Sequence, residues 1–202
     1  ATEFCKIHND AMAEAVSEYP DRFLGSAALP MQDVGAACKE LERATKTLGL
    51  VAVSTGTDYP FGLDDSRLDD FYKTMVEFNI PLFLHPASTG GAEGPDDWRM
   101  GRYDMSIMLG YAYEETLAVA TIVIGGVMDR HPDLDICISH GGGAMPYLIE
   151  RFVEMSEFRD WASDGVKENG FLSELKRLWF DAHVHGEKSQ AMLFDIIGEE
   201  RL

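Results

Sequence analysis

The chain has 202 residues, which suits one domain, and 46% of them are hydrophobic, which is enough for a sizeable core. The formal net charge of −18 would repel a phosphate backbone, so we do not expect nucleic-acid binding. The 3 cysteines are widely spaced and form no CxxC pair, which argues against a disulfide framework and favours a cytoplasmic protein.

Apolar stretches alternate with helical patterns from one end of the chain to the other. Strands are predicted at residues 23–29, 50–55, 80–84, 134–139 and 178–182. Helices are predicted at 33–48, 64–79 (with Asp64 as the cap), 114–130, 146–161 and 189–197. The glycine-containing segment 87–110 is predicted to be irregular. The longest apolar run, 117–128, is too short to cross a bilayer, so no membrane span is expected.

The strict alternation of strand and helix predicts parallel strands in a single domain over residues 1–202. A doubly wound sheet and a (β/α)₈ barrel both fit this pattern. His85 and His140 end their strands, and His183 and His185 lie just past the end of theirs. In a barrel these strand ends converge on one mouth, where the chemistry is found, so we favour the barrel.

His85 follows the apolar strand 80–84, and a neutral imidazole is a common ligand for zinc, iron or manganese. A histidine that ends a strand can instead bond a loop carbonyl. Asp181 has two interpretations as well, as the partner of a histidine or as a loop anchor.

His140 is followed by three glycines, which let the backbone approach a ligand closely and turn sharply into a helix. A histidine in this position can act as a general base, although a glycine-rich turn with an idle histidine is the alternative. The oxyanion loop of α/β-hydrolases also contains His-Gly-Gly-Gly. We reject that reading, because the only elbow-like segment, 52–56, precedes His140 instead of following it.

Four segments, taken together and in this order, carry a family resemblance: Pro81–Pro86, Gly125–Pro132, Ser139–Tyr147 and Phe180–His185. They resemble the amidohydrolase-related family that includes aminocarboxymuconate semialdehyde, γ-resorcylate and carboxyvanillate decarboxylases, with some hydratases and C–C hydrolases. The resemblance implies a distorted (β/α)₈ barrel. It also implies that His85 is a metal ligand from the fifth strand and that His140, from the sixth, is the catalytic acid/base.

The same resemblance implies that Trp98 and Arg151 bind the substrate, a small anion. It implies a divalent metal, zinc in the first place and manganese as the alternative, and a homodimer. Arg151 lies eleven positions after His140, well down the following helix, so we expect it to serve the neighbouring subunit's site. The alternative is an ordinary surface arginine paired with a nearby acid such as Glu154.

The sequence departs from the family in two places. The family has a His-x-His pair on its first strand and a metal-binding aspartate on its last. The only His-x-His in this chain is His183-Val184-His185, at the seventh-strand position, and Asp58 lies in a similar phrase at the wrong point of the chain. We therefore expect a partial barrel, about strands three to seven, without the first two strands and the last, which alone binds metal weakly and is inactive.

The function implied by the resemblance is metal-dependent, non-oxidative decarboxylation of a small aromatic or unsaturated carboxylate. A hydrolase or hydratase on the same scaffold is the first alternative, because the motifs serve both chemistries. An inactive fragment of such an enzyme is the second.

Overall fold

The computed structural model describes residues 1–87, 98–156 and 159–202, and within them five parallel strands form one sheet in the order β1-β2-β3-β4-β5. The strands are β1 (Ser26–Ala27), β2 (Ala52–Gly56), β3 (Leu82–His85), β4 (Ile136–Ile138) and β5 (Trp179–Phe180). A doubly wound sheet reverses its strand order at a switch point, whereas a barrel wall adds strands in sequence. The observed order therefore confirms the predicted partial barrel.

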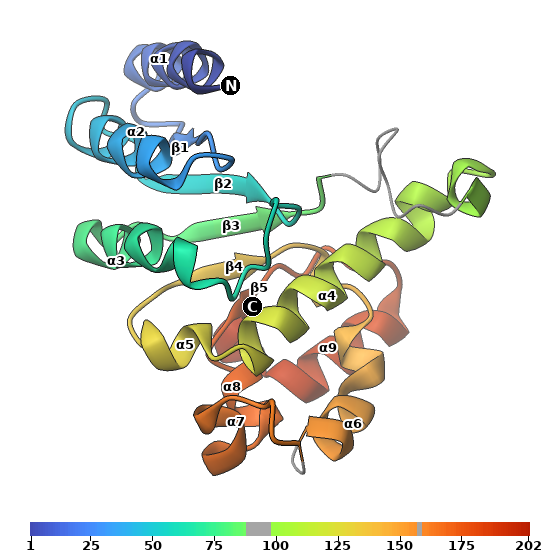
Figure 1. The fold of residues 1–202 in the computed structure, drawn as a ribbon. Helices are drawn as coiled ribbons and strands as arrows, with labels where there is room; N and C mark the ends of the chain where they lie inside the picture. Colours follow the sequence, from blue (N-terminus) through green and yellow to red (C-terminus); the bar gives the residue numbers. More distant parts are fainter. Residues whose placement is uncertain (88–97, 157–158) are drawn as a thin grey trace.

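Helices follow the strands and pack beside them (Figure 1). They are α1 (Thr2–Glu18), α2 (Val34–Lys46), α3 (Asp69–Phe78), α4 (Tyr111–Ile124), α5 (Val127–Arg130), α6 (Met145–Ser156), α7 (Asp164–Asn169), α8 (Phe171–Leu175) and α9 (Glu187–Ile197). Single turns lie between them: η1 (Ser66–Leu68), η2 (Trp98–Gly101), the π-helical η3 (Ser106–Gly110), η4 (His140–Gly142) and η5 (Glu199–Arg201).

Several predictions need correction. The helix predicted over 146–161 is shorter in the structure, where α6 ends at Ser156 and residues 159–161 are not helical. The helix predicted over 114–130 is broken at Gly126, whose φ of 68° lies in the left-handed region, so α4 ends and α5 begins there. Upstream, η3 runs directly into α4, which makes 106–110 helical instead of irregular. The predicted cap, Asp64, was wrong by one residue, because the Asp65 carboxylate accepts the backbone N–H of Arg67 and starts η1.

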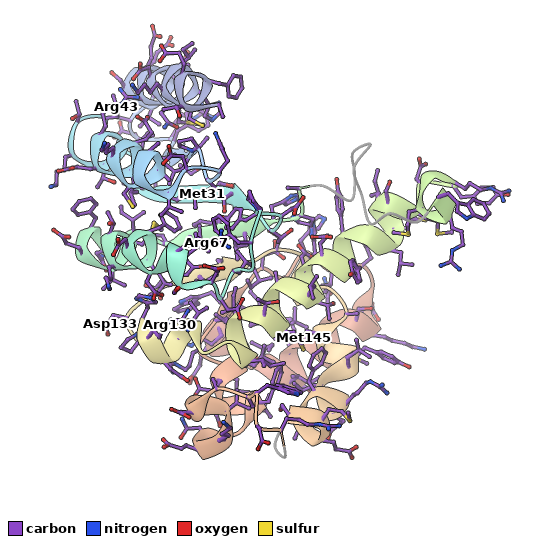
Figure 2. All side chains as sticks on the ribbon, in the orientation of Figure 1. Met31, Arg43, Arg67, Arg130, Asp133 and Met145 are labelled. Carbon is purple, nitrogen blue, oxygen red and sulfur yellow. The ribbon has the colours of Figure 1, made fainter. Side chains whose placement is uncertain are left out.

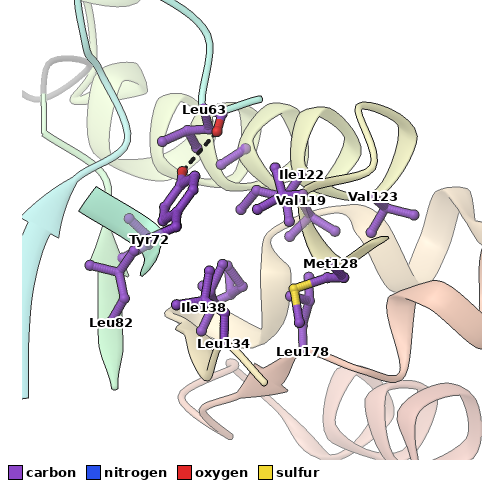
Figure 3. Close-up of a cluster of buried hydrophobic side chains, with 14 of the residues drawn as sticks. Leu63, Tyr72, Leu82, Val119, Ile122, Val123, Met128, Leu134, Ile138 and Leu178 are labelled. Atoms are coloured by element: carbon purple, nitrogen blue, oxygen red, sulfur yellow. Dashed lines mark hydrogen bonds between the residues drawn. The ribbon is translucent and has the colours of Figure 1, made fainter. Parts of the chain in front are cut away.

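The core lies between the sheet and the helices that cover one of its faces. Figure 3 shows part of it, with Leu82 and Ile138 of the strands below Val119 and Ile122 of α4. All four side chains are fully buried. At the edge of this cluster the Tyr72 hydroxyl donates to the Leu63 carbonyl oxygen at 2.7 Å, which satisfies the one polar atom that this ring brings into the core.

The other face of the sheet is open in this chain. Alternate residues of β3 point to opposite faces, so Leu82 and Leu84 are buried while Phe83 remains 43% exposed. Val51 and Trp179 are exposed beside it, and two shallow hollows of about 560 and 280 Å³ lie along this face. In a closed barrel the same face would point to the interior.

The segment Ser106–Ile124, which joins η3 and α4, is longer than the apolar run predicted from sequence. With 19 residues and a mean hydropathy of 1.4, it could cross a membrane by length and composition alone. The buried core helix of a globular protein passes the same test, and α4 packs on the sheet through Val119 and Ile122.

A buried asparagine attaches α1 to the rest of the chain. The Asn9 side chain donates to the Ala28 carbonyl oxygen at 3.0 Å and to Glu40 Oε1 at 2.8 Å, and its Oδ1 accepts the Ala28 N–H at 2.8 Å. Arg43, labelled in Figure 2, donates to Glu40 and reaches Asp10 on α1. Asn9 itself is fully buried and is the partner of both backbone polar groups of Ala28, whereas Glu40 keeps a second bond to Arg43.

We predict that Asn9→Ala lowers the free energy of unfolding by at least about 2 kcal/mol, because each buried polar group left without a partner costs about 1–3 kcal/mol. Urea unfolding followed by circular dichroism measures the change. Asp10→Ala is the control, since Asp10 is 58% exposed and its surface ion pair should contribute about 1 kcal/mol or less. Equal effects of the two substitutions would contradict this account.

Candidate active site

His85 is the last residue of β3 and stands at the carboxyl edge of the sheet, in register with Gly56 of β2. Its Nδ1 lies 2.9 Å from the Pro86 carbonyl oxygen. A carbonyl oxygen only accepts, so Nδ1 carries the proton and Nε2 keeps a lone pair. Metal-binding histidines use this arrangement, with one ring nitrogen held by a carbonyl and the other free for the metal.

His140 begins the turn that follows β4, and its ring centroid lies 5.0 Å from that of His85. The structure therefore brings together the two residues that the sequence selected. The turn is a run of left-handed residues, with φ values of 48° at His140 and 60° to 75° over the three glycines that follow. A histidine rarely adopts such a φ, so surrounding contacts must hold it there.

One of these contacts comes from Glu115 of α4, a residue that the sequence analysis did not select. Glu115 is fully buried, and its Oε1 lies 2.6 Å from His140 Nδ1. Its other oxygen, Oε2, has no hydrogen-bond partner among the described residues. The sequence feature that could have identified Glu115 is its helical spacing with Val119 and Ile122, which places a carboxylate on the buried face of an apolar helix.

Burial also sets the charge of this pair. Desolvation raises the pKa of Glu115 to about 9, and repulsion from Asp181 acts in the same direction. Desolvation lowers the pKa of His140, and the neighbouring His85 lowers it further. Both shifts favour the uncharged forms, a carboxylic acid and a neutral imidazole.

A cavity of about 470 Å³ lies against His140. His183 and His185 also line it, together with Tyr111 and Met108. The centroid of the His183 ring is 5.6 Å from that of His140 and 5.5 Å from that of His185. With His85, four imidazole rings form a chain along the carboxyl edge of the sheet, beside a space that suits one small ring.

Asp181 is a loop anchor. Its Oδ1 accepts the backbone N–H groups of Gly141 at 3.3 Å and His183 at 3.0 Å. It thereby ties the turn after β4 to the segment after β5. Within the described residues, Asp181 accepts no hydrogen bond from an imidazole nitrogen.

The described residues do not complete a metal site. Among them, no group of three His, Cys, Asp or Glu side chains converges on a point that could hold a metal ion. His85 offers one free nitrogen, whereas a catalytic zinc usually needs three protein ligands. The described part of the chain thus supplies part of a metal site at most.

The structure does not bring Trp98 and Arg151 to the histidines. Trp98 begins η2 and is 78% exposed, and Arg151 is exposed on α6. Neither lines the cavity beside His140, and within the described residues Arg151 forms no ion pair. Substrate binding by these two residues therefore stays a prediction.

Comparison with known proteins places this geometry in a family. A family model described as amidohydrolase matches residues 1–202. The chain belongs to the amidohydrolase family. It is 30% identical to the 2-amino-3-carboxymuconate-6-semialdehyde decarboxylase of Dictyostelium discoideum over 203 residues, which cover 100% of the chain and 55% of that protein. It is 36% identical to a γ-resorcylate decarboxylase of a Polaromonas species over 163 residues, covering 75% of the chain and 48% of that protein.

Among solved structures, the chain is similar to the 5-carboxyvanillate decarboxylase of Novosphingobium aromaticivorans, determined with bound manganese. The TM-score is 0.84 at 25% identity, over 98% of this chain and 58% of the other. The chain spans about half the length of the curated relatives it matches. The family inferred from the ordered segments is therefore confirmed.

We predict that Gly143→Ala disrupts the site far more than Gly186→Ala. Both glycines have a left-handed φ, 66° and 90°, so alanine costs about 1–3 kcal/mol of strain at either. At Gly143 the new Cβ would also strike the Ala112 carbonyl oxygen of α4, whereas at Gly186 nothing lies within 4 Å. Overpacking should add about 1–3 kcal/mol at Gly143. Thermal unfolding of both variants measures the difference, and equal midpoints would refute the packing argument.

Proposed function

We propose that the protein carrying this chain catalyses the metal-dependent, non-oxidative decarboxylation of a small aromatic or unsaturated carboxylate. The observation that carries this proposal is the pairing of His85 and His140 at the carboxyl ends of β3 and β4, 5.0 Å apart and next to a cavity of about 470 Å³. Further support comes from the names of the relatives, which are decarboxylases of aromatic and unsaturated carboxylates.

The reaction breaks the bond between the carboxylate and its carbon. Carbon dioxide leaves, the electron pair stays on the carbon, and that carbon takes up a proton. His140 is the proton carrier that we assign, because Glu115 occupies its Nδ1 and leaves Nε2 for a ligand in the cavity. The segment after β5, with His183 and His185, closes another side of this space.

A divalent metal, when bound, would orient the substrate and polarise its hydroxyl group. His85 is the ligand that we assign from this chain, and its free Nε2 supports that role. An imidazole ligand suits zinc. The similar 5-carboxyvanillate decarboxylase contains manganese, so manganese is a candidate beside zinc.

We also propose a cytoplasmic homodimer. The described cysteines are free, as expected in a reducing compartment. The substrate is an anion, so its carboxylate needs a cation. Arg151 is exposed and away from the cavity of its own chain, which supports a role in the site of a second subunit.

The activity is tested on the protein at its full natural length, loaded with manganese or zinc. We expect carbon dioxide release from a panel that includes γ-resorcylate and 5-carboxyvanillate, and loss of the activity after chelation. His140→Gln should lower kcat by about 10²–10⁴-fold, because a proton carrier is removed. His8→Gln, on the exposed face of α1, is the matched control and should leave kcat unchanged. Addition of water without carbon dioxide release would replace this proposal with a hydratase.

The dimer is tested by mixing two variants of the same full-length enzyme. We expect Arg151→Ala and His140→Ala each to be inactive alone. If Arg151 acts on the neighbouring site, a mixed dimer contains one intact site, and part of the activity should return after subunit exchange. Native mass spectrometry verifies that mixed dimers have formed. Mixed dimers without recovered activity would exclude this role of Arg151.

A further inference from the structure

Glu115 does not line the cavity beside His140, yet it is fully buried against the residue that carries the proton. Two consecutive residues of α4 hold the turn after β4. The Glu115 carboxyl contacts His140 Nδ1 at 2.6 Å, and the Thr116 hydroxyl accepts the Ala144 N–H at 2.8 Å. The position of Glu115 is therefore fixed by the packing of the whole helix on this turn.

The unpartnered oxygen of Glu115 indicates which form of the carboxyl group this environment accepts. A carboxylate would place a full negative charge in a region closed to water, with no donor to Oε2. A carboxylic acid leaves only a neutral carbonyl oxygen without a partner, which costs much less. Asp181 lies close enough to repel an ionised Glu115 as well. The acid form is thus the one that the geometry favours.

We propose that Glu115 is a positioning residue for His140. Its carboxyl O–H donates to Nδ1, holds the imidazole in the tautomer that is protonated at Nε2, and presents that N–H to the cavity. The left-handed φ of 48° at His140 fits this role, because a bond to the ring helps to hold a backbone that would otherwise relax.

This role of Glu115 specifies how His140 would donate a proton, and it rests on the proposed function. Decarboxylation needs a proton at the carbon that loses its carboxylate, so the histidine must offer an N–H toward the substrate. An ionised glutamate would instead accept a hydrogen bond from Nδ1–H, and a neutral imidazole would then turn the Nε2 lone pair toward the cavity. The choice between acid and base at His140 would then be made by one buried carboxyl group on α4.

The tautomer of His140 can be read directly by nitrogen NMR of the imidazole ring, without substrate or metal. Histidine-labelled protein is compared with the His140→Gln variant, whose missing signals assign the ring. We expect a protonated Nε2 and an unprotonated Nδ1 at neutral pH. A ring protonated at Nδ1 alone, or at both nitrogens, would overturn the proposal. This measurement is independent of catalysis, so a failure of the decarboxylation assay would not affect it.

Three variants test whether Glu115 sets the tautomer. Glu115→Gln keeps a donor at the same place, because its amide N–H can replace the acid O–H, so the Nε2–H form should persist. Glu115→Leu removes the donor, and the two ring signals should move toward each other as the tautomers exchange. Glu114→Gln, next to it on α4 and bonded to Thr57 instead, is the control and should change neither signal.

Kinetics of the full-length enzyme supply a second readout. Glu115→Leu should lower kcat at least tenfold with little change in KM, and Glu115→Gln should retain most of the activity. Should the leucine variant fail to fold, the wild-type tautomer and the glutamine variant still decide the question. A folded leucine variant with the wild-type ring signals would show that Glu115 is structural only.

Discussion

The close packing of α4 against the turn after β4 is the contact on which the site depends. Gly143 lies so near the Ala112 carbonyl oxygen that no side chain fits between them. At the next residue of the turn, Ala144, the backbone N–H donates to the Thr116 hydroxyl of α4. Because the two backbones meet at this distance, the carboxyl group of Glu115 reaches an imidazole that a helix at ordinary spacing would leave to water.

Parallel pairing supplies the second constraint. Leu84 is in register with Ile138, so His85, one residue after Leu84, and His140, two residues after Ile138, emerge side by side although 55 positions separate them in sequence. The Ser139 hydroxyl donates to the Leu84 carbonyl oxygen at 2.8 Å and continues this pairing past the end of β4. The rings of His85 and His140 therefore meet because two strand ends are aligned, and neither needs a long loop to reach the other.

The sequence predicted the parts of this arrangement that follow from periodicity. Alternating apolar and helical segments gave the parallel sheet, and histidines at two strand ends gave the pair in the site. The break at Gly126 was missed because glycine is also tolerated within a helix, at a cost of about 1 kcal/mol relative to alanine. Glu115 was missed because the identity of a buried polar partner depends on tertiary packing, which a one-dimensional pattern does not contain. Trp98 and Arg151 lie outside the strands, in η2 and α6, so the strand pattern does not predict where they lie relative to a substrate.

The strand order also has a bearing on how the chain reaches this structure. Strands that are neighbours in the sheet are also consecutive in sequence, and one or more helices lie in each connection between them. The entropy cost of pairing two strands grows with the length of chain between them. Because each strand pairs with strands that are consecutive to it in sequence, the sheet can grow without pairing strands from distant parts of the chain. Assembly can therefore proceed from β1 to β5 as the polypeptide emerges from the ribosome. The turn after β4, which needs β3, α4 and β4 together, would be completed before α9 is synthesised.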